Sequence, residues 1–569
     1  MEKINLKKND ITELSITDTG EDSQGIGRFR GFAFFVKDAL PGDVVKAVVT
    51  KVNKGYGYAK TLEIIKPSPD RVDAPCPAAR RCGGCQLMEL SYKRQLEIKE
   101  EKVRNNLIRL GGIDPDAVLW EPVIGMEAAD FSFGTGIKGI GLSGGAEGGK
   151  SFKSGTDASA GAAGSAGGFC PLRYRNKVQL PAGRSKDGRP VFGFYAGRTH
   201  YIVETDDCPA AFEECGVIIR ALRRFMEENN ISVYDEKTGK GLVRHVLLRK
   251  GFATGQIMVC IVVNSEFGMR NAEFGMRNSE CGMRNVEFEK RNAEFGMRGV
   301  LLAAGLNITS ICINFNSKKT NVILGEKTVT IYGNPYIEDK ISGLTFRISA
   351  QSFFQVNSIQ TEKLYAKALE YAALTGNETV WDLYCGIGTI SLFLAKKAKK
   401  VYGVEIVPQA IENAKENAKL NHIENAEFFC GKSEEVFPAF YGQTVLKDRA
   451  GAEFCTDADD GFRSGADAEN ETGNDLSGTQ VPAAAKMPKA DVVVLDPPRK
   501  GCDSTLLSAI LNTEPERIVY VSCNSATLAR DLKILSQKYV LEKAAPCDMF
   551  PHTNHCEVAA ALSLKRNCP

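Results

Sequence analysis

The sequence predicts a multidomain α/β protein with an N-terminal OB-like β-barrel, a central α+β domain and a C-terminal Rossmann-like domain. Three observations support this organisation. A chain of 569 residues is too long for a single hydrophobic core. Residues 1–67 alternate apolar and polar side chains between glycine turns, which is typical of a small barrel. From about residue 346 onward, strand-like and helix-like segments alternate, which is typical of a doubly wound sheet.

The predicted barrel, residues 1–67, interleaves aromatic and basic side chains in the segment GIGRFRGFAFFVKDALPGDVVKAVVTKVNKGYGYAKTLEII. Barrels of this kind bind oligonucleotides by stacking bases on aromatic rings while lysines contact phosphates. The alternative interpretation is that Phe32, Phe34 and Phe35 simply fill the barrel. Both interpretations predict the same fold.

The central domain is predicted at residues 70–345, with insertions near 125–169 and 264–298. The first insertion is rich in Gly, Ser and Ala and cannot bury enough apolar surface to order itself. The second holds five seven-residue units such as NAEFGMR. A coiled coil is disfavoured, because heptad seams need spacings of three and four and glycine weakens a helix. We interpret the repeat as a tandem expansion in a surface loop.

A basic stretch, RYRNKVQLPAGRSKDGRPVFGFYAGR, occupies residues 173–198 of this domain. Arg and Lys interleaved with Tyr and Phe suit RNA, because cations neutralise phosphates and rings stack on bases. A solvated strand face would produce a similar pattern.

The composition limits the function classes open to the chain. The net charge is only +2, so a nucleic-acid surface must come from local basic clusters. The sequence has no apolar run of about 18 residues and starts with the polar stretch MEKINLKKND. We therefore expect a cytoplasmic protein without membrane association. Its 17 cysteines should be thiols or metal ligands more often than disulfides.

Three cysteines of the central domain have metal-ligand spacing. Cys76, Cys82 and Cys85 follow the pattern C-x5-C-x2-C in a glycine-bearing loop. Structural zinc prefers two short pairs, whereas an iron–sulfur cluster accepts three local cysteines and a distant fourth. Cys170 and Cys208 compete for the fourth position, and the insertion beside Cys170 argues against it. Buried thiols without metal are the alternative interpretation.

The C-terminal domain, residues 346–569, contains an insertion near 440–487 and a ligand-binding pattern in its first half. Gly386 and Gly388 leave room for a ligand at the end of the first strand. Glu405 ends the second strand, where a carboxylate can accept hydrogen bonds from ribose hydroxyls. The turn reads D-x-x-C-G-x-G, which disfavours a dinucleotide. The pattern resembles the S-adenosylmethionine-binding half of class I methyltransferases.

Three chemically active side chains are predicted to converge at one edge of this sheet. Asp496 and Cys523 end two parallel strands, and Glu557 begins a final antiparallel strand. In doubly wound sheets, ligands bind beyond the carboxyl ends of the parallel strands. A helix is expected right after Cys523, and a helix start favours a thiolate. The alternative interpretation of Cys523 is a small buried hydrophobe.

A thiol and a carboxylate are the groups needed to methylate C5 of uracil. That carbon is barely nucleophilic until a thiolate adds to C6, and a base must later remove the C5 proton. The motifs of this chain, in their order, resemble those of the RNA uracil-5-methyltransferases: FFQVN, DLYCGIGT, LDPPRKG, VYVSCNSATLARDL and MFPHTNHCE. The first segment of the chain resembles the TRAM module, an RNA-binding barrel.

The resemblance implies roles for individual residues. It implies Cys523 as nucleophile and Glu557 as general base. The implied S-adenosylmethionine contacts are Gln355, Tyr384, Glu405 and Asp496. Thr389 departs from members with Asn after the glycine turn, so it is not assigned to the site. His552, His555 and Cys556 have a spacing unlike that of closed zinc sites.

The resemblance also implies a 4Fe-4S cluster on Cys76, Cys82, Cys85 and Cys208, because one subfamily has its last ligand in a Cys-Pro context. The combination of an N-terminal barrel and a cluster resembles the branch of the uracil-5-methyltransferase family that acts on 23S ribosomal RNA. Methylation of the tRNA T-loop uridine is the alternative within the class. A noncatalytic iron–sulfur protein that binds RNA is the alternative from another class. We expect RNA as the partner, and no obligate protein partner is evident.

Overall fold

The structure is a computed structural model that describes residues 6–20, 24–131, 169–197, 199–264, 296–447, 453–457 and 488–566. The chain divides into two compact units. The N-terminal unit comprises Met1–Ile98, Met126–Pro335 and Phe550–Asn554, and the C-terminal unit comprises Lys99–Gly125, Tyr336–Met549 and His555–Pro569. In the described ranges, no helix is both long and apolar enough to cross a membrane. The insertions predicted near 125–169, 264–298 and 440–487 lie largely outside the described residues.

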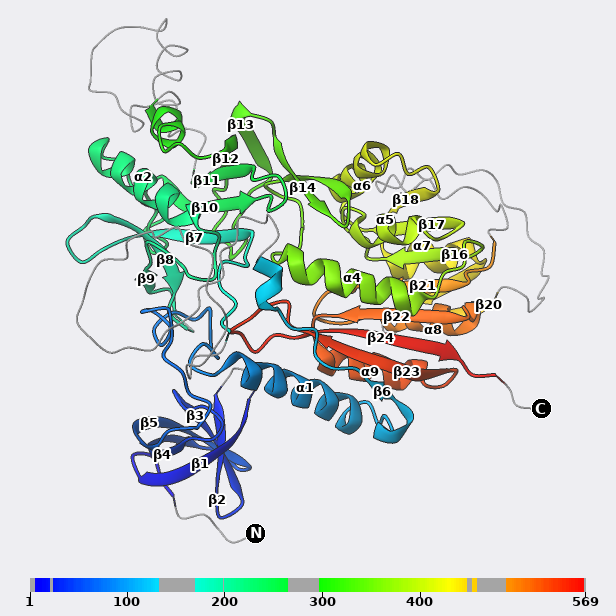
Figure 1. The fold of residues 1–569 in the computed structure, drawn as a ribbon, viewed down its shortest axis with the longest axis horizontal. Helices are drawn as coiled ribbons and strands as arrows, with labels where there is room; N and C mark the ends of the chain where they lie inside the picture. Colours follow the sequence, from blue (N-terminus) through cyan, green and yellow to red (C-terminus); the bar gives the residue numbers. More distant parts are fainter. Residues whose placement is uncertain are drawn as a thin grey trace, which may run out of the picture. The chain divides into compact units, whose positions relative to one another are not determined.

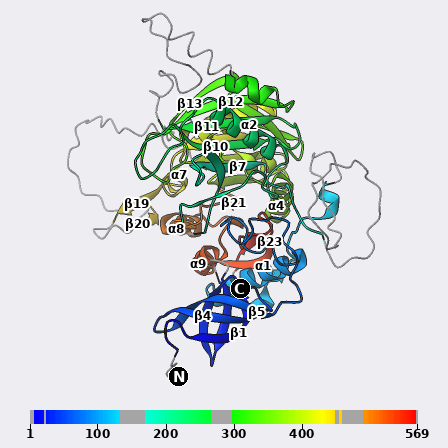
Figure 2. The same cartoon turned by 90° about the vertical axis from the view of Figure 1, so that its left-hand side faces the viewer.

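The predicted barrel is present as a closed five-stranded barrel in the order β1-β2-β3-β5-β4 (Figure 2). Its strands are β1 (Ile11–Thr19), β2 (Gly25–Phe29), β3 (Phe32–Lys37), β4 (Val44–Val52) and β5 (Tyr56–Lys66). Because side chains alternate along a strand, Leu14, Phe34 and Val45 are directed inward and buried. A Cβ at Gly57 would come within 2.3 Å of the Phe34 ring, so glycine makes room for it. Phe34 therefore fills the barrel, whereas the neighbouring Phe35 lies on its outside.

The rest of the N-terminal unit is built on a seven-stranded sheet in the order β13-β12-β11-β10-β7-β8-β9. Its strands are β7 (Lys177–Arg184), β8 (Pro190–Tyr195), β9 (Ile202–Glu204), β10 (Val243–Lys250), β11 (Ile257–Val263), β12 (Ile308–Phe315) and β13 (Lys327–Gly333). Only the β11–β12 pair is parallel. Helix α2 (Glu214–Glu228) packs its apolar stripe, which includes Ile218, Leu222 and Phe225, toward the sheet.

The C-terminal unit contains an eight-stranded sheet in the order β18-β17-β16-β21-β22-β24-β23-β6 (Figure 1). Its strands are β6 (Leu119–Trp120), β16 (Thr379–Leu383), β17 (Lys400–Glu405), β18 (Ala426–Cys430), β21 (Val492–Leu495), β22 (Arg517–Ser522), β23 (Tyr539–Cys547) and β24 (Glu557–Leu564). The first five strands in spatial order are parallel, and β24 is antiparallel to both neighbours. This order confirms the predicted Rossmann-like fold of the C-terminal half.

Helices cover both faces of this sheet, and several of them connect consecutive parallel strands. They are α1 (Tyr92–Arg109), α4 (Ser358–Ala372), α5 (Thr389–Ala395), α6 (Pro408–Leu420), α7 (Ser433–Phe440), α8 (Ser504–Thr513) and α9 (Ser525–Leu535). Two hairpins complete the unit: β14 (Tyr336–Ile341) with β15 (Leu344–Ser349), and β19 (Gln443–Lys447) with β20 (Glu453–Asp457). Short 3-10 helices span Pro115–Ala117 and, in the N-terminal unit, Ala128–Phe131.

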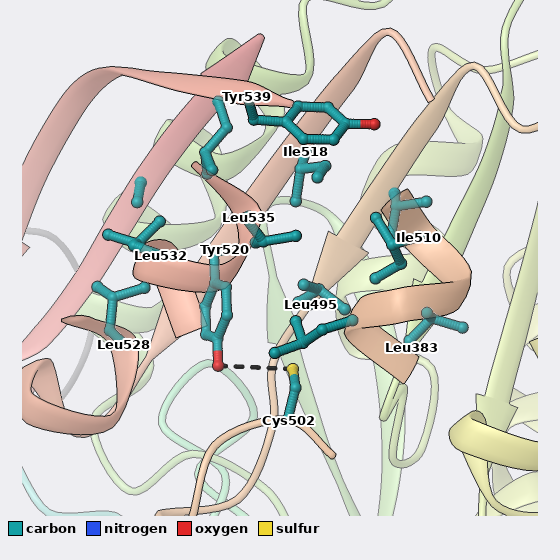
Figure 3. Packing of buried hydrophobic residues seen from close by; sticks show 14 of the residues in the cluster. Leu383, Leu495, Cys502, Ile510, Ile518, Tyr520, Leu528, Leu532, Leu535 and Tyr539 are labelled. Carbon is teal, nitrogen blue, oxygen red and sulfur yellow. Dashed lines mark hydrogen bonds between the residues drawn. The ribbon is translucent and has the colours of Figure 1, made fainter. Parts of the chain in front are cut away.

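One face of the eight-stranded sheet forms a large hydrophobic core with α1, α7, α8 and α9. Figure 3 shows part of it, where Ile518 and Tyr520 of β22 lie between residues of α8 and α9. Each fully buried Leu or Ile side chain contributes about 1.5–3 kcal/mol. Because this core holds β21, β22 and α9 together, the loops that follow these strands start from fixed positions.

Candidate active site

Two strand ends and one strand start place chemically active side chains at one edge of the eight-stranded sheet. β21 and β22 are parallel neighbours, and Asp496 directly follows the last residue of β21. β24 runs antiparallel to β22, with Ser522 opposite Val558. Continuing this register places Cys523, the residue after β22, opposite Glu557, the first residue of β24. The sequence-predicted trio of Asp496, Cys523 and Glu557 therefore meets at one edge.

Cys523 lies among charged groups at this edge. Burial and, to a smaller extent, the neighbouring carboxyl groups of Glu557 and Asp496 raise the pKa of its thiol to about 12, against an opposing effect of Arg499. Helix α9 does start just beyond Cys523, where the side chain of Asn524 accepts a hydrogen bond from the Ala526 N–H at 3.0 Å. Burial and the two carboxyl groups therefore oppose the thiolate that this helix start is expected to favour.

Three carboxyl groups near this edge have raised pKa values and hold their protons more strongly than usual. Burial raises the pKa of Glu557 to about 8, with a further contribution from Asp496 and an opposing one from Arg499. Burial and the nearby Asp382 raise the pKa of Asp496 to about 7. Burial likewise raises the pKa of Asp382 to about 7, although its Oδ2 accepts a hydrogen bond from Ser391.

This concentration of carboxyl groups suits a cationic ligand. Asp382 and Glu557 are buried and Asp496 is half-buried, and one oxygen of Asp382 has no hydrogen-bond partner within the described structure. A positive charge bound near a carboxyl group favours its ionised form. S-adenosylmethionine carries a positively charged sulfonium and a positively charged ammonium group. These charges would compensate the negative charge of the ionised carboxyl groups.

The end of β17 provides a second part of the site. The carboxylate of Glu405 accepts hydrogen bonds from the N–H groups of Gly386, at 3.2 Å, and Val407, at 3.0 Å. Gly386 and Gly388 have φ values of 57° and 81°, in the left-handed region that favours glycine. Gly388 is the N-cap of α5. The turn is open at Gly386, where a Cβ would meet nothing within 4 Å, whereas Gly388 packs against Ala414 and Phe428. The open backbone beside the Glu405 carboxylate is an arrangement that can bind a ribose diol.

The remaining predicted cofactor contacts, Gln355 and Tyr384, lie on different segments. Gln355 is half-buried and precedes Asn357, whose side chain caps α4 by accepting from Gln360 N–H. Tyr384 follows β16 with a φ of 72°. Its ring packs against the hydrophobic core, and burial raises the pKa of its phenol, which lies near Cys502. The Tyr384 hydroxyl is thus directed toward the loop after β21.

The loop of residues 496–503 is held against α9 by hydrogen bonds to the buried carboxylate of Asp531. Asp531 accepts hydrogen bonds from the Cys502 N–H at 2.8 Å and the Tyr520 hydroxyl at 2.6 Å. Arg530 bonds to both Asp531 and the Cys502 carbonyl. Figure 3 shows the contact between Tyr520 and Cys502, whose oxygen and sulfur are 3.5 Å apart. These hydrogen bonds connect the loop after β21 to the helix that follows Cys523.

The same loop carries Arg499, a site residue that the sequence analysis did not assign. Its carbonyl accepts hydrogen bonds from Asn524 at 3.3 Å and Thr527 at 3.2 Å, so α9 holds its backbone. Its charge lowers the pKa of both Cys523 and Glu557. Two signals could have found the missed residues: Arg499 lies within the LDPPRKG motif, and Asp382 is a charged residue in an apolar strand.

The four cysteines predicted as cluster ligands come together in the N-terminal unit, and all four are free thiols. Burial raises the pKa of Cys85 to about 12, with further contributions from Cys208, Cys82 and Cys76. Burial also raises the pKa of Cys208, and Cys76 adds to this effect. Among the described residues, the pKa of Cys170 is raised by burial and shows no effect of another cysteine. The Cys170 Sγ lies 3.9 Å from His552 Nε2.

These thiols are not arranged around a single ion. Within the described ranges, no group of three or more His, Cys, Asp or Glu side chains is placed to hold a metal ion. His552 is buried in the N-terminal unit, where its Nε2 lies 2.8 Å from the Pro171 carbonyl and its Nδ1 3.3 Å from the Gln95 amide. These bonds fix the imidazole in the packing of its loop.

Comparisons with known proteins agree with this geometry. A family model described as tRNA (Uracil-5-)-methyltransferase matches residues 281–453 and 485–566, and the TRAM domain model matches residues 6–62. A protein of Halalkalibacterium halodurans named an uncharacterized RNA methyltransferase is 40% identical, covering 98% of both chains. A protein of the same name from Clostridium acetobutylicum is 41% identical, covering 99% of both chains.

A solved structure is similar over nearly the whole chain. It is the crystal structure of Pyrococcus abyssi tRNA (uracil-54, C5)-methyltransferase in complex with S-adenosyl-L-homocysteine. The two chains are 25% identical with a TM-score of 0.61, covering 97% of this chain and 100% of the other.

Fold, site and relatives together define an S-adenosylmethionine-dependent RNA methyltransferase with an N-terminal TRAM barrel. More narrowly, the chain belongs to the tRNA (uracil-5-)-methyltransferase family. The name of the family does not assign a particular RNA to this chain.

Proposed function

We propose that this enzyme methylates C5 of uracil in 23S ribosomal RNA through a covalent bond between Cys523 and C6 of the base. The observation that carries the proposal is the register of β22 and β24, which sets Cys523 opposite Glu557 at the ligand-binding edge of the sheet. A nucleophile and a base on facing strand ends can act on adjacent atoms of one ring. Asp496 and Arg499 flank them with opposite charges.

In the proposed reaction, Cys523 Sγ forms a bond to C6, and the electrons of the C5–C6 double bond make C5 nucleophilic. C5 then takes the methyl group of S-adenosylmethionine, which leaves as S-adenosylhomocysteine. Glu557 removes the proton that remains on C5. The electrons of that C–H bond restore the double bond and expel the Cys523 thiolate, so the enzyme returns to its starting state.

Glu557 is suited to the role of base once a cation is bound beside it. Its pKa, raised by burial to about 8, makes it a stronger base than an ordinary carboxylate. Asp496, half-buried at the adjacent strand end, contributes to raising the pKa of Glu557. We propose Asp496, Glu405, Gln355 and Tyr384 as the residues that contact the cofactor.

We further propose that Cys76, Cys82, Cys85 and Cys208 hold a 4Fe-4S cluster. Three features support the fit: Cys208, Cys82 and Cys76 raise the pKa of Cys85, Gly84 N–H donates to Cys82 Sγ at 3.3 Å, and Arg175 lowers the pKa of Cys85 and Cys208. Backbone N–H donors and a nearby cation stabilise four thiolates around an anionic cluster. Uracil methylation moves no net electrons, so the thiol ligands would serve to fix the loops of this unit.

The RNA is proposed to be 23S ribosomal RNA in the cytoplasm, with tRNA as the second candidate. The barrel together with the four cysteines favours ribosomal RNA. The similarity to a tRNA (uracil-54, C5)-methyltransferase favours tRNA.

The test is to incubate unmodified 23S ribosomal RNA and unmodified tRNA separately with the enzyme and methyl-labelled cofactor, and then to map the labelled nucleotide. We expect label at C5 of uridine in the ribosomal RNA. Label only in tRNA would assign the second candidate, and label in neither RNA would contradict the proposed reaction.

A further inference from the structure

The loop that leads into Glu557 is built into the N-terminal unit. Its residues Phe550–Asn554 belong to that unit, whereas the chain from His555 onward belongs to the C-terminal unit. Glu557 is the first residue of β24, and only His555 and Cys556 separate it from Asn554. Because each residue extends a chain by at most about 3.6 Å, so short a connection leaves little slack between the loop and the proposed base.

His552, at the centre of this loop, is anchored by several segments of the N-terminal unit. The residue is only 1% exposed. Its carbonyl accepts a hydrogen bond from the Leu87 N–H at 2.8 Å, and its Nε2 lies 2.8 Å from the Pro171 carbonyl. The Tyr174 hydroxyl donates to the carbonyl of the preceding Pro551 at 3.0 Å. With a φ of 67°, His552 adopts a left-handed conformation that non-glycine residues keep only where their surroundings enforce it.

Gln95 holds both the backbone and the ring of His552 with one buried amide group. Its Oε1 accepts a hydrogen bond from the His552 N–H at 2.9 Å. Its Nε2 donates to the Leu90 carbonyl at 2.9 Å and lies 3.3 Å from His552 Nδ1. Because an amide nitrogen can only donate, Nδ1 is the acceptor, and the ring proton lies on Nε2, which faces the Pro171 carbonyl. The two side chains therefore fix each other's orientation.

We propose that Gln95 is a positioning residue for Glu557 and acts through His552. Gln95 lies in the first part of α1, within the N-terminal unit, and does not itself belong to the reacting groups. Its amide fixes His552, His552 fixes the loop, and the loop ends two residues before the carboxyl group that removes the C5 proton. The inference rests on the proposed function and deepens it, because it assigns the proton-removal step a determinant outside the C-terminal unit.

The substitution Gln95→Met tests this role, because it replaces the amide with an apolar side chain of similar length. Methyl transfer precedes the step that needs the base, so a misplaced Glu557 should slow only the later step. We expect kcat to fall about 10- to 100-fold with the KM for RNA unchanged, the size of effect that misplacing a reacting group by about 1 Å produces. A methylated covalent adduct should accumulate on ordinary uridine RNA.

The measurement combines two readouts on the RNA that the wild type methylates. Rapid quenching with methyl-labelled cofactor gives the rate of the first methyl transfer, which should equal that of the wild type. Denaturing electrophoresis gives the amount of adduct, with Glu557→Gln as the reference for a disabled base. A first methyl transfer as slow as overall turnover, without adduct, would overturn the proposal.

His552→Asn is the second variant, since asparagine tolerates the left-handed conformation but lacks the imidazole ring. We expect the same accumulation of adduct. Because both substitutions break one contact, the double variant should lower kcat no further than the more severe single variant. Independent, multiplying losses would show that Gln95 does not act through His552.

Leu222→Ala is the control for stability, because it leaves a cavity under α2 and changes no residue of the loop or its anchors. It should lower the melting temperature without accumulating adduct or changing kcat at low temperature. If Gln95→Met behaves like this control, Gln95 is merely structural and the proposal fails.

Two results separate this inference from the proposed function. If Glu557→Gln accumulates the adduct and Gln95→Met does not, the positioning role fails and the proposed reaction stands. If neither variant forms an adduct and RNA containing 5-fluorouridine traps no wild-type enzyme, the proposed reaction itself is contradicted.

Discussion

Cys523 and the four cysteines of the N-terminal unit differ in what surrounds them. Cys523 lies between two carboxyl groups and an arginine at the edge of a parallel sheet. Cys76, Cys82, Cys85 and Cys208 have one another as neighbours. The surroundings of a thiol limit its role: Cys523 has a carboxyl group opposite it on the next strand, whereas the four cysteines of the N-terminal unit have other thiols nearby.

The substitution Cys523→Ala tests the proposed role of this thiol as nucleophile and should have the largest effect. We expect Cys523→Ala to lower methyl transfer by about 10⁴-fold or more, because the addition to C6 has no substitute. Iron content and thermal stability should not change. Cys170→Ala, which removes a thiol outside both groups, is the control and should retain activity. Methyl transfer by Cys523→Ala at more than a hundredth of the wild-type rate would contradict the account.

Glu557→Gln tests the partner on the facing strand. Methyl transfer to C5 precedes the step that needs the base, so this variant should complete one transfer and then accumulate a methylated covalent adduct. Steady-state turnover should fall about 10²- to 10⁴-fold, the usual contribution of a general base. Denaturing electrophoresis with ordinary uridine RNA detects the adduct. A large loss of turnover without any adduct would place Glu557 before the methyl-transfer step.

Cys85→Ser tests the proposed role of the four cysteines of the N-terminal unit as cluster ligands. We expect loss of iron and a lower melting temperature, because the ligand set would be incomplete. Activity at low temperature should fall much less than for Cys523→Ala, since these thiols do not take part in the proposed chemistry. Elemental analysis of protein purified without oxygen measures the iron, with Cys170→Ala as the matched control. Full iron content in Cys85→Ser would exclude it as a ligand.

The charge of the cofactor should control the ionisation of Cys523. Its thiol pKa is raised to about 12, first by burial and then by Glu557 and Asp496. A bound cation favours the thiolate, so S-adenosylmethionine should lower this pKa by about one unit and speed alkylation of Cys523 about tenfold at pH 8. S-adenosylhomocysteine has nearly the same shape without the sulfonium charge and is the control. Equal rates with both ligands would exclude this electrostatic coupling.

The smallest effect is expected from Asp531, which fastens the loop of Arg499 to α9. Asp531→Asn keeps the size of the side chain and weakens the bonds to Cys502 and Tyr520. We expect a decrease of about tenfold in kcat with little change in KM, because misplacing Arg499 affects the reaction more than RNA binding. Tyr520→Phe removes one of these bonds and should have a weaker effect. A change in KM alone would show that Asp531 does not position the reacting groups.

Much of the fold could be predicted because its signals are local. Strand and helix periods from residue 346 onward predicted the Rossmann-like sheet, and alternation predicted the barrel. Alternation could not tell whether Phe34 or Phe35 points inward, since that depends on the register with Gly57. Residues 99–125 belong to the C-terminal unit although they precede most of the N-terminal unit in sequence. This assignment depends on tertiary packing, so no local sequence pattern could predict it.

The positions of the candidate site residues could be predicted for those side chains that lie at the ends of strands. Topology alone brings Asp496, Cys523 and Glu557 to one edge, so their positions in sequence were sufficient. The ionisation of Cys523 was not predictable, because the helix start is visible in the sequence but the opposing burial is not. The role of Arg499 depends on its distance to Cys523 and Glu557, which only the folded loop defines.

The most direct test of the central claim uses RNA that contains 5-fluorouridine, together with S-adenosylmethionine. Fluorine at C5 leaves no proton for Glu557 to remove, so the bond between enzyme and base cannot break after methyl transfer. The account predicts a stable protein–RNA adduct whose peptide map places the modified base on Cys523, and no adduct for Cys523→Ala. An adduct on another cysteine, or none with RNA that the enzyme otherwise methylates, would contradict it.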